Sequence, residues 1–200
     1  MTKSLNDVHA VVTGGARGIG AAIAERLDTL GVRLTLMGRQ SEPLIKKCAG
    51  LRQAQPIAVD VTREAAVTDA FTKAREKFGP VGILVNNAGA ANSAPLDRLE
   101  FKDWQTMLDV NLTSVFLCSR AVLPDMRAAQ WGRIINVSST AGLKGYAYVT
   151  AYCAAKHGAV GLTRALALET ARAGITVNAV CPGYTNTELL DGALEKIIGK

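Results

Sequence analysis

A tyrosine and a lysine, Tyr152 and Lys156, stand four residues apart, and Ser139 precedes the tyrosine by thirteen positions. Residues four positions apart share one face of a helix, so the Lys156 ammonium can lie beside the Tyr152 phenol and favour its ionised form. An unperturbed phenol has a pKa of about 10. The pair therefore predicts a phenol that exchanges protons near neutral pH, as carbonyl reduction or alcohol oxidation requires.

A glycine-rich segment follows the first apolar run of the chain and precedes the first helical stretch. Missing side chains at such a turn let backbone N–H groups approach a pyrophosphate at the positive end of a helix. A glycine-rich turn alone is a weak signal because such turns are common. Its position after a strand favours a dinucleotide site, for which we predict Gly14, Arg17, Gly18, Ile19 and Gly20.

The end of the second apolar run predicts which nicotinamide cofactor binds. An acidic residue about 20 positions past the glycine segment would hydrogen-bond both ribose hydroxyls and repel a 2′-phosphate. The chain instead has Gly38 and Arg39 there, and Arg17 adds a second guanidinium. Guanidinium groups bind phosphates well, so NADP is favoured over NAD. The alternative is that both arginines are ordinary surface residues without a ligand.

Apolar runs of strand length alternate with helical stretches, which predicts an α/β fold with a parallel sheet covered on both faces. The expected strands are 9–12, 34–37, 56–59, 82–85, 133–137 and 175–180. The expected helices are 18–30, 41–53, 64–78, 99–129 with a break at Asn111, and 151–173.

Composition points to one domain over 1–200, since 200 residues at 48% hydrophobic suffice for a sizeable core. The four cysteines lack metal-ligand spacing, so we expect reduced thiols, no disulfide and no metal site. They are Cys48, Cys118, Cys153 and Cys181.

The net charge of +6 comes from scattered Lys and Arg residues, and few aromatic side chains are available for stacking. Nucleic-acid binding is therefore not expected, and an anionic cofactor or an acyl thioester explains the charge equally well. Residues 1–7 lack an apolar signal core, and no apolar run approaches the roughly 20 residues of a membrane span. We expect a cytoplasmic protein without membrane contact.

Two helical stretches are apolar around most of their circumference, where a single buried stripe would leave one polar face. A second covering partner is implied, and the simplest is another copy of the chain. We therefore expect a homo-dimer or homo-tetramer formed through helices 111–129 and 151–173.

Taken together, these motifs resemble the short-chain dehydrogenase/reductase family over nearly the whole chain. The resemblance implies a Rossmann-type doubly wound sheet in the order 3-2-1-4-5-6. The matching positions beyond the glycine segment are Asp60-Val61, Asn86-Asn87-Ala88-Gly89, Asn111, Ser139, Tyr152 with Lys156, and Pro182-Gly183 followed by Thr187.

The resemblance also implies roles for four catalytic residues. Tyr152 would be the proton donor or acceptor, and Ser139 would hydrogen-bond the substrate oxygen. Lys156 would bind the nicotinamide ribose and, with the positive nicotinamide, lower the pKa of Tyr152. Asn111 would hold a water in a proton relay to Lys156.

Further contacts to the cofactor follow from the same resemblance. Asp60 and Val61 would contact the adenine, and the turn that begins at Asn86 would lie beneath the cofactor. The segment from Pro182 to Thr187 would fix the carboxamide. The cofactor residues implied are Asp60, Val61, Asn87, Ala88, Gly89, Tyr152, Lys156, Pro182, Gly183, Thr185 and Thr187.

The stretches 152–158 and 180–187 are most similar to enzymes acting on 3-oxoacyl or 3-hydroxyacyl thioesters, and also to 3-hydroxybutyrate dehydrogenases. The predicted function is NADP(H)-dependent hydride transfer to or from such a thioester of CoA or acyl carrier protein. The carrier-protein contacts of related reductases are replaced by Gln130 and Ala173, with Arg127, Arg133 and Arg172 near enough to substitute. The alternatives are a 3-hydroxybutyrate or other small-alcohol dehydrogenase and an NADP-binding module without turnover.

Members of the family continue past the position of Leu190 through a substrate lid, a helix and a last strand, whereas this chain ends at Lys200. We therefore expect the final strand and part of the lid to be absent and the edge of strand 175–180 to be exposed. Residues 187–200 are expected to form a mobile first lid helix. The expected consequence is retained cofactor binding with weak turnover.

Overall fold

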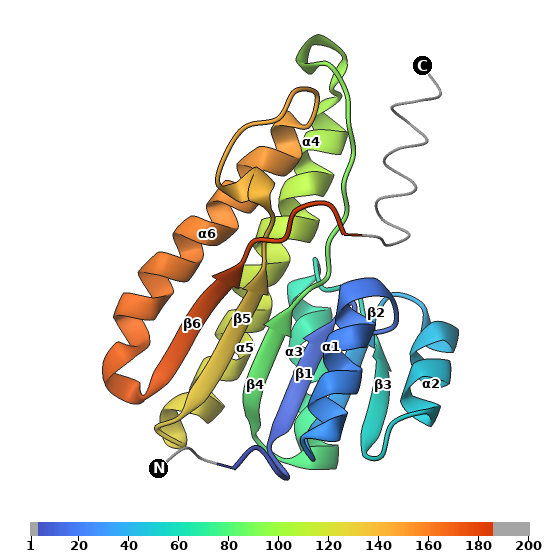
Figure 1. Ribbon diagram of the computed structural model, residues 1–200, viewed down its shortest axis with the longest axis vertical. Coiled ribbons are helices and arrows are strands. Elements are labelled where there is room, and N and C mark those ends of the chain that lie inside the picture. Colours follow the sequence, from blue (N-terminus) through green and yellow to red (C-terminus); the bar gives the residue numbers. More distant parts are fainter. Residues whose placement is uncertain (1–3, 186–200) are drawn as a thin grey trace.

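The computed structural model describes residues 4–185, and the predictions for Thr187 and for a helix over 187–200 lie outside these residues. Within this range, six parallel strands form one sheet in the order β3-β2-β1-β4-β5-β6, which confirms the predicted fold (Figure 1). The strands are β1 His9–Thr13, β2 Arg33–Gly38, β3 Ala54–Ala58, β4 Val81–Asn86, β5 Gly132–Val137 and β6 Ile175–Val180.

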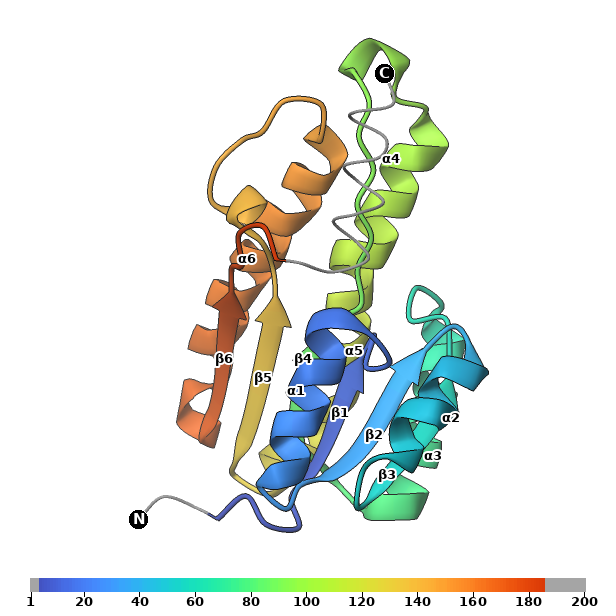
Figure 2. The same cartoon turned by 45° about the vertical axis from the view of Figure 1, so that its right-hand side comes forward.

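Helices make the crossovers that parallel strands require, and they cover both faces of the sheet (Figure 1, Figure 2). Helices α1 and α2 pack on one face, while α3, α5 and α6 pack on the other. The helices are α1 Gly18–Thr29, α2 Ser41–Ala49, α3 Glu64–Phe78, α4 Phe101–Leu108, α5 Ser114–Ala128 and α6 Thr150–Thr170.

Alternate residues of each central strand enter different cores. In β1, Val11 joins the core beneath α3 and α5, whereas Ala10 and Val12 join the core beneath α1 and α2. All five β1 residues are buried, as expected for a strand covered on both faces. This two-sided burial explains why the strands read as continuous apolar runs.

The expected break at Asn111 is instead a change of helix type. Asp109–Thr113 is π-helical and joins α4 to α5 without interruption. Three residues leave no periodicity to detect, so short 3₁₀ helices are not predictable from sequence pattern. The described part of the chain has three of them, and only the last lies within a predicted helix, 151–173. They are Leu96–Arg98, Thr140–Gly142 and Ala171–Ala173.

The helical run Phe101–Ala128 is long and apolar enough to cross a membrane by length and composition, although the sequence analysis expected no such run. Apolar side chains of this run pack in the protein core. Leu117, Val122 and Met126 of α5 are nearly or fully buried against the sheet and α3. We therefore interpret the run as a core helix of a doubly wound fold.

Candidate active site

The predicted site residues gather at the carboxyl ends of the strands. The glycine segment follows β1, Asn87 follows β4, Ser139 follows β5 and Pro182 lies two residues after β6. Strands β1 and β4 are neighbours from which the connections run in opposite directions. In open α/β sheets, ligands bind at such a topological switch point.

The glycine segment needs its glycines for conformation and for space. Gly14 and Gly18 have φ values of 64° and 50°, which residues with a side chain rarely adopt. A Cβ on Gly20 would lie 2.3 Å from the Gly14 carbonyl oxygen and 2.4 Å from Asn87 Nδ2. The N-cap residue Arg17 makes no side-chain capping hydrogen bond to α1. The first-turn N–H groups are therefore placed to receive a phosphate.

Thr13 and Asn87 join the carboxyl ends of β1 and β4, a role that the sequence analysis did not assign to Thr13. Thr13 Oγ1 accepts hydrogen bonds from the N–H groups of Asn87 and Ala88, each at 3.0 Å. Asn87 Nδ2 donates to the carbonyl oxygens of Thr13 and Gly14 at 3.0 and 3.1 Å. These bonds hold the glycine segment against the turn after β4. A hydroxyl residue at the end of a strand, just before the glycines, is the sequence signal.

Ser139, Tyr152 and Lys156 come together as predicted. Lys156 Nζ lies 5.6 Å from the centroid of the Tyr152 ring and donates a 2.9 Å hydrogen bond to the Val137 carbonyl oxygen. Ser139 lies close enough to Tyr152 for its side chain to favour the ionised phenol. Ser139 Oγ also accepts the N–H of Ala141 at 3.1 Å, which leaves its hydroxyl proton free to be donated.

Burial shifts the pKa values of two of these groups. Burial raises the pKa of Tyr152, and the Ser139 side chain only partly opposes this effect. Burial also lowers the pKa of Lys156 from 10.5 to about 8. Burial disfavours the charged forms of both groups, and the expectation that Lys156 and the nicotinamide together lower the pKa of Tyr152 stays a prediction. At neutral pH the phenol is protonated and suited to donate a proton.

Asn111 is buried in the π-helical turn, close to Lys156. Its Nδ2 donates to the carbonyl oxygens of Ala90 and Met107 at 2.9 and 3.0 Å, and its Oδ1 accepts the Ala90 N–H at 3.3 Å. A Cβ on Gly89 would lie 2.9 Å from Asn111 Oδ1 and 3.7 Å from Lys156 Nζ. Asn111 thus holds the segment after β4 beside Lys156, and its role in a water relay stays a prediction.

Asn86, the last residue of β4, has its side chain bonded within the core. Its Nδ2 donates to Ser119 Oγ at 3.1 Å and to Asn136 Oδ1 at 2.8 Å. Asn136 Nδ2 in turn donates to Thr163 Oγ1 at 2.8 Å. These four buried side chains join β4 and β5 to α5 and α6, so Asn86 has a structural role.

The adenosine end of the predicted site lies after β2 and β3. Asp60 Oδ1 accepts hydrogen bonds from the hydroxyl and N–H of Thr62 at 2.7 and 3.0 Å. These bonds, with a smaller effect from Arg39, hold the pKa of Asp60 below its ordinary value. Val61 is 6% exposed and belongs to the core, so only its backbone is available to an adenine. At Gly38 an added Cβ would meet only Leu44, at 3.7 Å.

Two segments close the site near Ser139. The Thr140 N–H donates to the Pro182 carbonyl oxygen at 2.9 Å, which places 182–185 beside Ser139. The Tyr146 hydroxyl donates to Thr140 Oγ1 at 3.0 Å. The Ala94 N–H donates to the carbonyl oxygen of Tyr148, whose φ of 65° is unusual for a bulky residue. These bonds connect the segments after β4, β5 and β6.

Comparison with known proteins gives consistent matches over nearly the whole chain. The family model described as short chain dehydrogenase matches residues 8–197. D-beta-hydroxybutyrate dehydrogenase of Cupriavidus necator is 42% identical, covering 96% of this chain and 76% of that protein. Acetoacetyl-CoA reductase of Paracoccus denitrificans is 38% identical, covering 96% and 79%. Among solved structures, a variant of actinorhodin polyketide ketoreductase with NADPH has a TM-score of 0.93 at 36% identity, covering 100% of this chain and 78% of that one.

Proposed function

Because the chain belongs to the short-chain dehydrogenase family of oxidoreductases, we propose that it reduces 3-oxoacyl thioesters with NADPH, using Tyr152 as the proton donor. One observation carries this proposal. Tyr152 lies beside Ser139 and Lys156 at the carboxyl edge of the sheet, and burial raises its pKa. A phenol that keeps its proton at neutral pH can donate it to a carbonyl oxygen.

The three side chains divide the work at the carbonyl group. When bound, a nicotinamide cofactor would supply the hydride for the carbonyl carbon. Ser139 donates its hydroxyl proton in a hydrogen bond to the carbonyl oxygen, where negative charge develops. Tyr152 transfers its phenol proton to the same oxygen. Lys156, held by the Val137 carbonyl, stabilises the phenolate that results and binds the nicotinamide ribose.

The described residues suit NADP. Gly14, Gly18 and Gly20 leave room for a pyrophosphate at the start of α1. Arg17 and Arg39 are the proposed contacts of the 2′-phosphate. The ketoreductase of similar structure was solved with NADPH. Further proposed contacts are Ile19, Asp60, Val61, Asn87, Ala88, Gly89, Pro182, Gly183 and Thr185.

A CoA thioester is better supported than a carrier-protein thioester. Arg127 pairs with Glu169 at 3.0 Å. Arg133 donates to two backbone carbonyls, and its guanidinium lies 4.7 Å from the Trp131 ring centroid. Two of the three arginines that might replace carrier-protein contacts are therefore engaged within the chain. The similarity to an acetoacetyl-CoA reductase agrees with this choice.

A second candidate, oxidation of a 3-hydroxy acid such as 3-hydroxybutyrate, is favoured by the relative from Cupriavidus necator. The two candidates differ in the acyl group, because a free carboxylate replaces the thioester. They also use the phenol in opposite protonation states, since reduction needs a protonated Tyr152 and oxidation needs an ionised one.

We also propose that the protein forms homo-oligomers through α5 and α6. Phe116 of α5 is 45% exposed and Leu168 of α6 is 83% exposed. Large apolar side chains on neighbouring helices are expected at an interface between copies of a chain.

The test titrates NADPH by fluorescence and then adds acetoacetyl-CoA while absorbance at the NADPH band is followed. We expect saturable binding and oxidation of NADPH. The same assay with 3-hydroxybutyrate and NADP or NAD tests the second candidate. Cofactor binding without turnover of either substrate would instead identify a binding module and contradict the proposal.

The Tyr152→Phe variant supplies the control for the chemistry. It removes the transferable proton while the ring keeps its packing, so turnover should fall by orders of magnitude, roughly the 10²–10⁴-fold worth of an acid catalyst. NADPH affinity should change little. Near-normal turnover by this variant would show that another group is the acid.

A further inference from the structure

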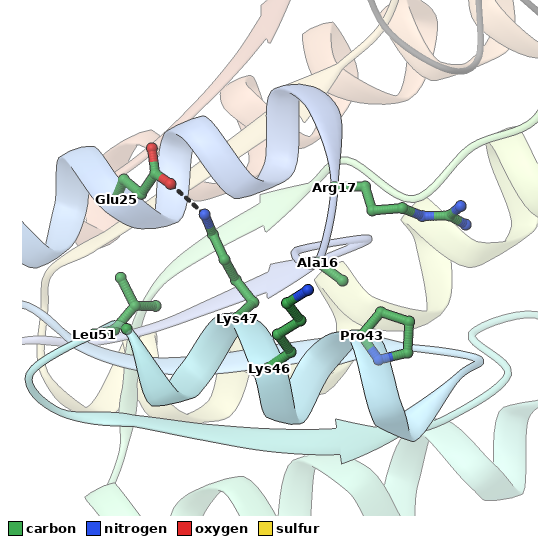
Figure 3. Close-up of a pocket in the computed structure, with 8 residues that line it drawn as sticks. Ala16, Arg17, Glu25, Pro43, Lys46, Lys47 and Leu51 are labelled. Carbon is green, nitrogen blue, oxygen red and sulfur yellow. Dashed lines mark hydrogen bonds and ion pairs between the residues drawn. The ribbon is translucent and has the colours of Figure 1, made fainter.

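A basic groove lies between α1 and α2, directly beside the glycine segment (Figure 3). Its volume is about 420 Å³. The side chains lining it include three cations, Arg17, Lys46 and Lys47, and one acid, Glu25. The groove therefore carries a net positive charge and is complementary to an anion.

The two lysines of the groove differ in what they contact. Lys47 forms an ion pair with Glu25 across the groove. Lys46, the preceding residue of α2, points toward Ala16 of the glycine segment in Figure 3. Among residues 4–185, Lys46 has no hydrogen bond or ion pair. Its ammonium is thus a cation of the groove that no described residue already pairs with.

We propose that Lys46 is a specificity-determining residue that binds a phosphate group, the 2′-phosphate of NADP, together with Arg17. This inference rests on the proposed function. Helix α2 begins at Ser41, two residues after Arg39 at the end of β2, where the adenosine ribose is proposed to lie. Helical side chains tilt toward the N-terminus of their helix, so the long Lys46 side chain extends toward that end of α2. The ammonium thereby reaches the region between α2 and the glycine segment.

The test measures dissociation constants of NADPH and NADH by fluorescence for the wild type and for two charge-matched variants, Lys46→Ala and Lys47→Ala. Each variant removes one positive charge from the same helix, so a general field effect would weaken NADPH equally in both. A direct contact predicts about three- to tenfold weaker NADPH binding for Lys46→Ala only, with NADH within about twofold. Lys46→Arg should retain most of the NADPH affinity.

Competition by inorganic phosphate tests whether the groove binds the 2′-phosphate of NADP or a separate phosphate compound. If the groove holds the 2′-phosphate, inorganic phosphate should compete with NADPH more than with NADH, and Lys46→Ala should reduce this competition. Equal effects of the two alanine variants, or NADPH affinity unchanged by Lys46→Ala, would overturn the inference. Phosphate binding that leaves NADPH affinity unchanged would assign the groove to a separate phosphate compound and overturn it as well. Failure of the proposed function is distinct, because the wild type itself would then bind neither nucleotide.

Discussion

At the scale of single residues, we propose that the residue after β2 decides which cofactor is preferred. An aspartate at this edge would repel a 2′-phosphate, whereas Arg39 attracts it. The Arg39 charge contributes to the lowered pKa of Asp60, two residues after β3. The residue before it, Gly38, has space for a side chain, so the absence of an acid there does not follow from packing.

We predict that Arg39→Asp reverses the preference from NADP toward NAD. The substitution removes a charge-assisted contact to the 2′-phosphate and supplies an acceptor for the ribose hydroxyls, so the ratio of kcat/KM values should change by more than about tenfold. Steady-state kinetics with both cofactors measures this ratio. Equal losses with NADP and NAD would show that Arg39 does not contact the phosphate. Arg52, which pairs with Asp28 away from the site, gives a control in Arg52→Asp.

At the scale of elements, the structure combines predictable units with turns that only tertiary contacts define. The six strands were predictable because burial on both faces makes each one a short apolar run, as in Leu34 to Met37. The π-helical turn around Asn111 was not, because its sequence continues the helical pattern on both sides. Its side chain bonds Ala90, a residue 21 positions away, and no local pattern encodes that contact.

The candidate site shows the same division. Tyr152, Lys156 and Ser139 were recognisable from spacing, since two lie on one helix face and the third follows a strand. The link between Thr13 and Asn87 spans 74 positions and was not predicted. The raised pKa of Tyr152 was also missed, because burial depends on how the whole fold covers the phenol.

The start of β1 gives a prediction on pH. His9 is buried, with Nδ1 bonded to the Gly79 carbonyl oxygen and Nε2 to Thr35 Oγ1, each at 2.8 Å. Burial lowers its pKa from 6.5 to about 4. The unfolded chain therefore binds a proton between these values when the folded chain does not. The contribution of neutral His9 to the free energy of unfolding should be fully present above about pH 6.5. It should fall by up to about 3 kcal/mol as pH decreases to 4.

Urea unfolding between pH 7 and 4 measures this loss. In His9→Asn, the part of the pH dependence of the unfolding free energy that comes from the imidazole should disappear. His157, the other histidine of the chain, is exposed, so His157→Asn should retain the full slope. Identical pH dependence of the wild type and His9→Asn would contradict the prediction.

At the scale of the whole molecule, the proposed interface uses surface that the chain does not need for its own core. Leu168 is exposed, whereas Leu166 packs against the core beneath α5. The helices that carry the exposed apolar residues also frame the site, since α6 holds Tyr152 and Lys156. Association would therefore support the helix that positions the proposed acid.

We expect Leu168→Glu to produce monomers in light scattering, because it places a charge in the proposed contact. Leu96→Glu is a matched control, since Leu96 is also exposed, at 67%, but lies in the 3₁₀ helix before α4. This control should keep the wild-type assembly. An unchanged oligomer in Leu168→Glu would place the interface elsewhere.

The buried lysine has a thermodynamic consequence for the protein as a whole. Folding lowers the pKa of Lys156 from 10.5 to about 8, so the unfolded chain holds its proton more tightly than the folded one. The difference costs up to about 3 kcal/mol of folding free energy at pH 7, and the cost decreases as pH rises from 8 to 10.5. A side chain without charge avoids this cost.

Lys156→Met should therefore unfold at higher urea concentration than the wild type at pH 7, by about 1–3 kcal/mol, while losing turnover. The gain should shrink toward pH 10, where the wild-type lysine is largely neutral in the folded state. A less stable Met variant at pH 7 would mean that the bond to the Val137 carbonyl outweighs the burial of charge. The expected gain would mean that selection for catalysis has left this protein less resistant to unfolding than its own scaffold permits.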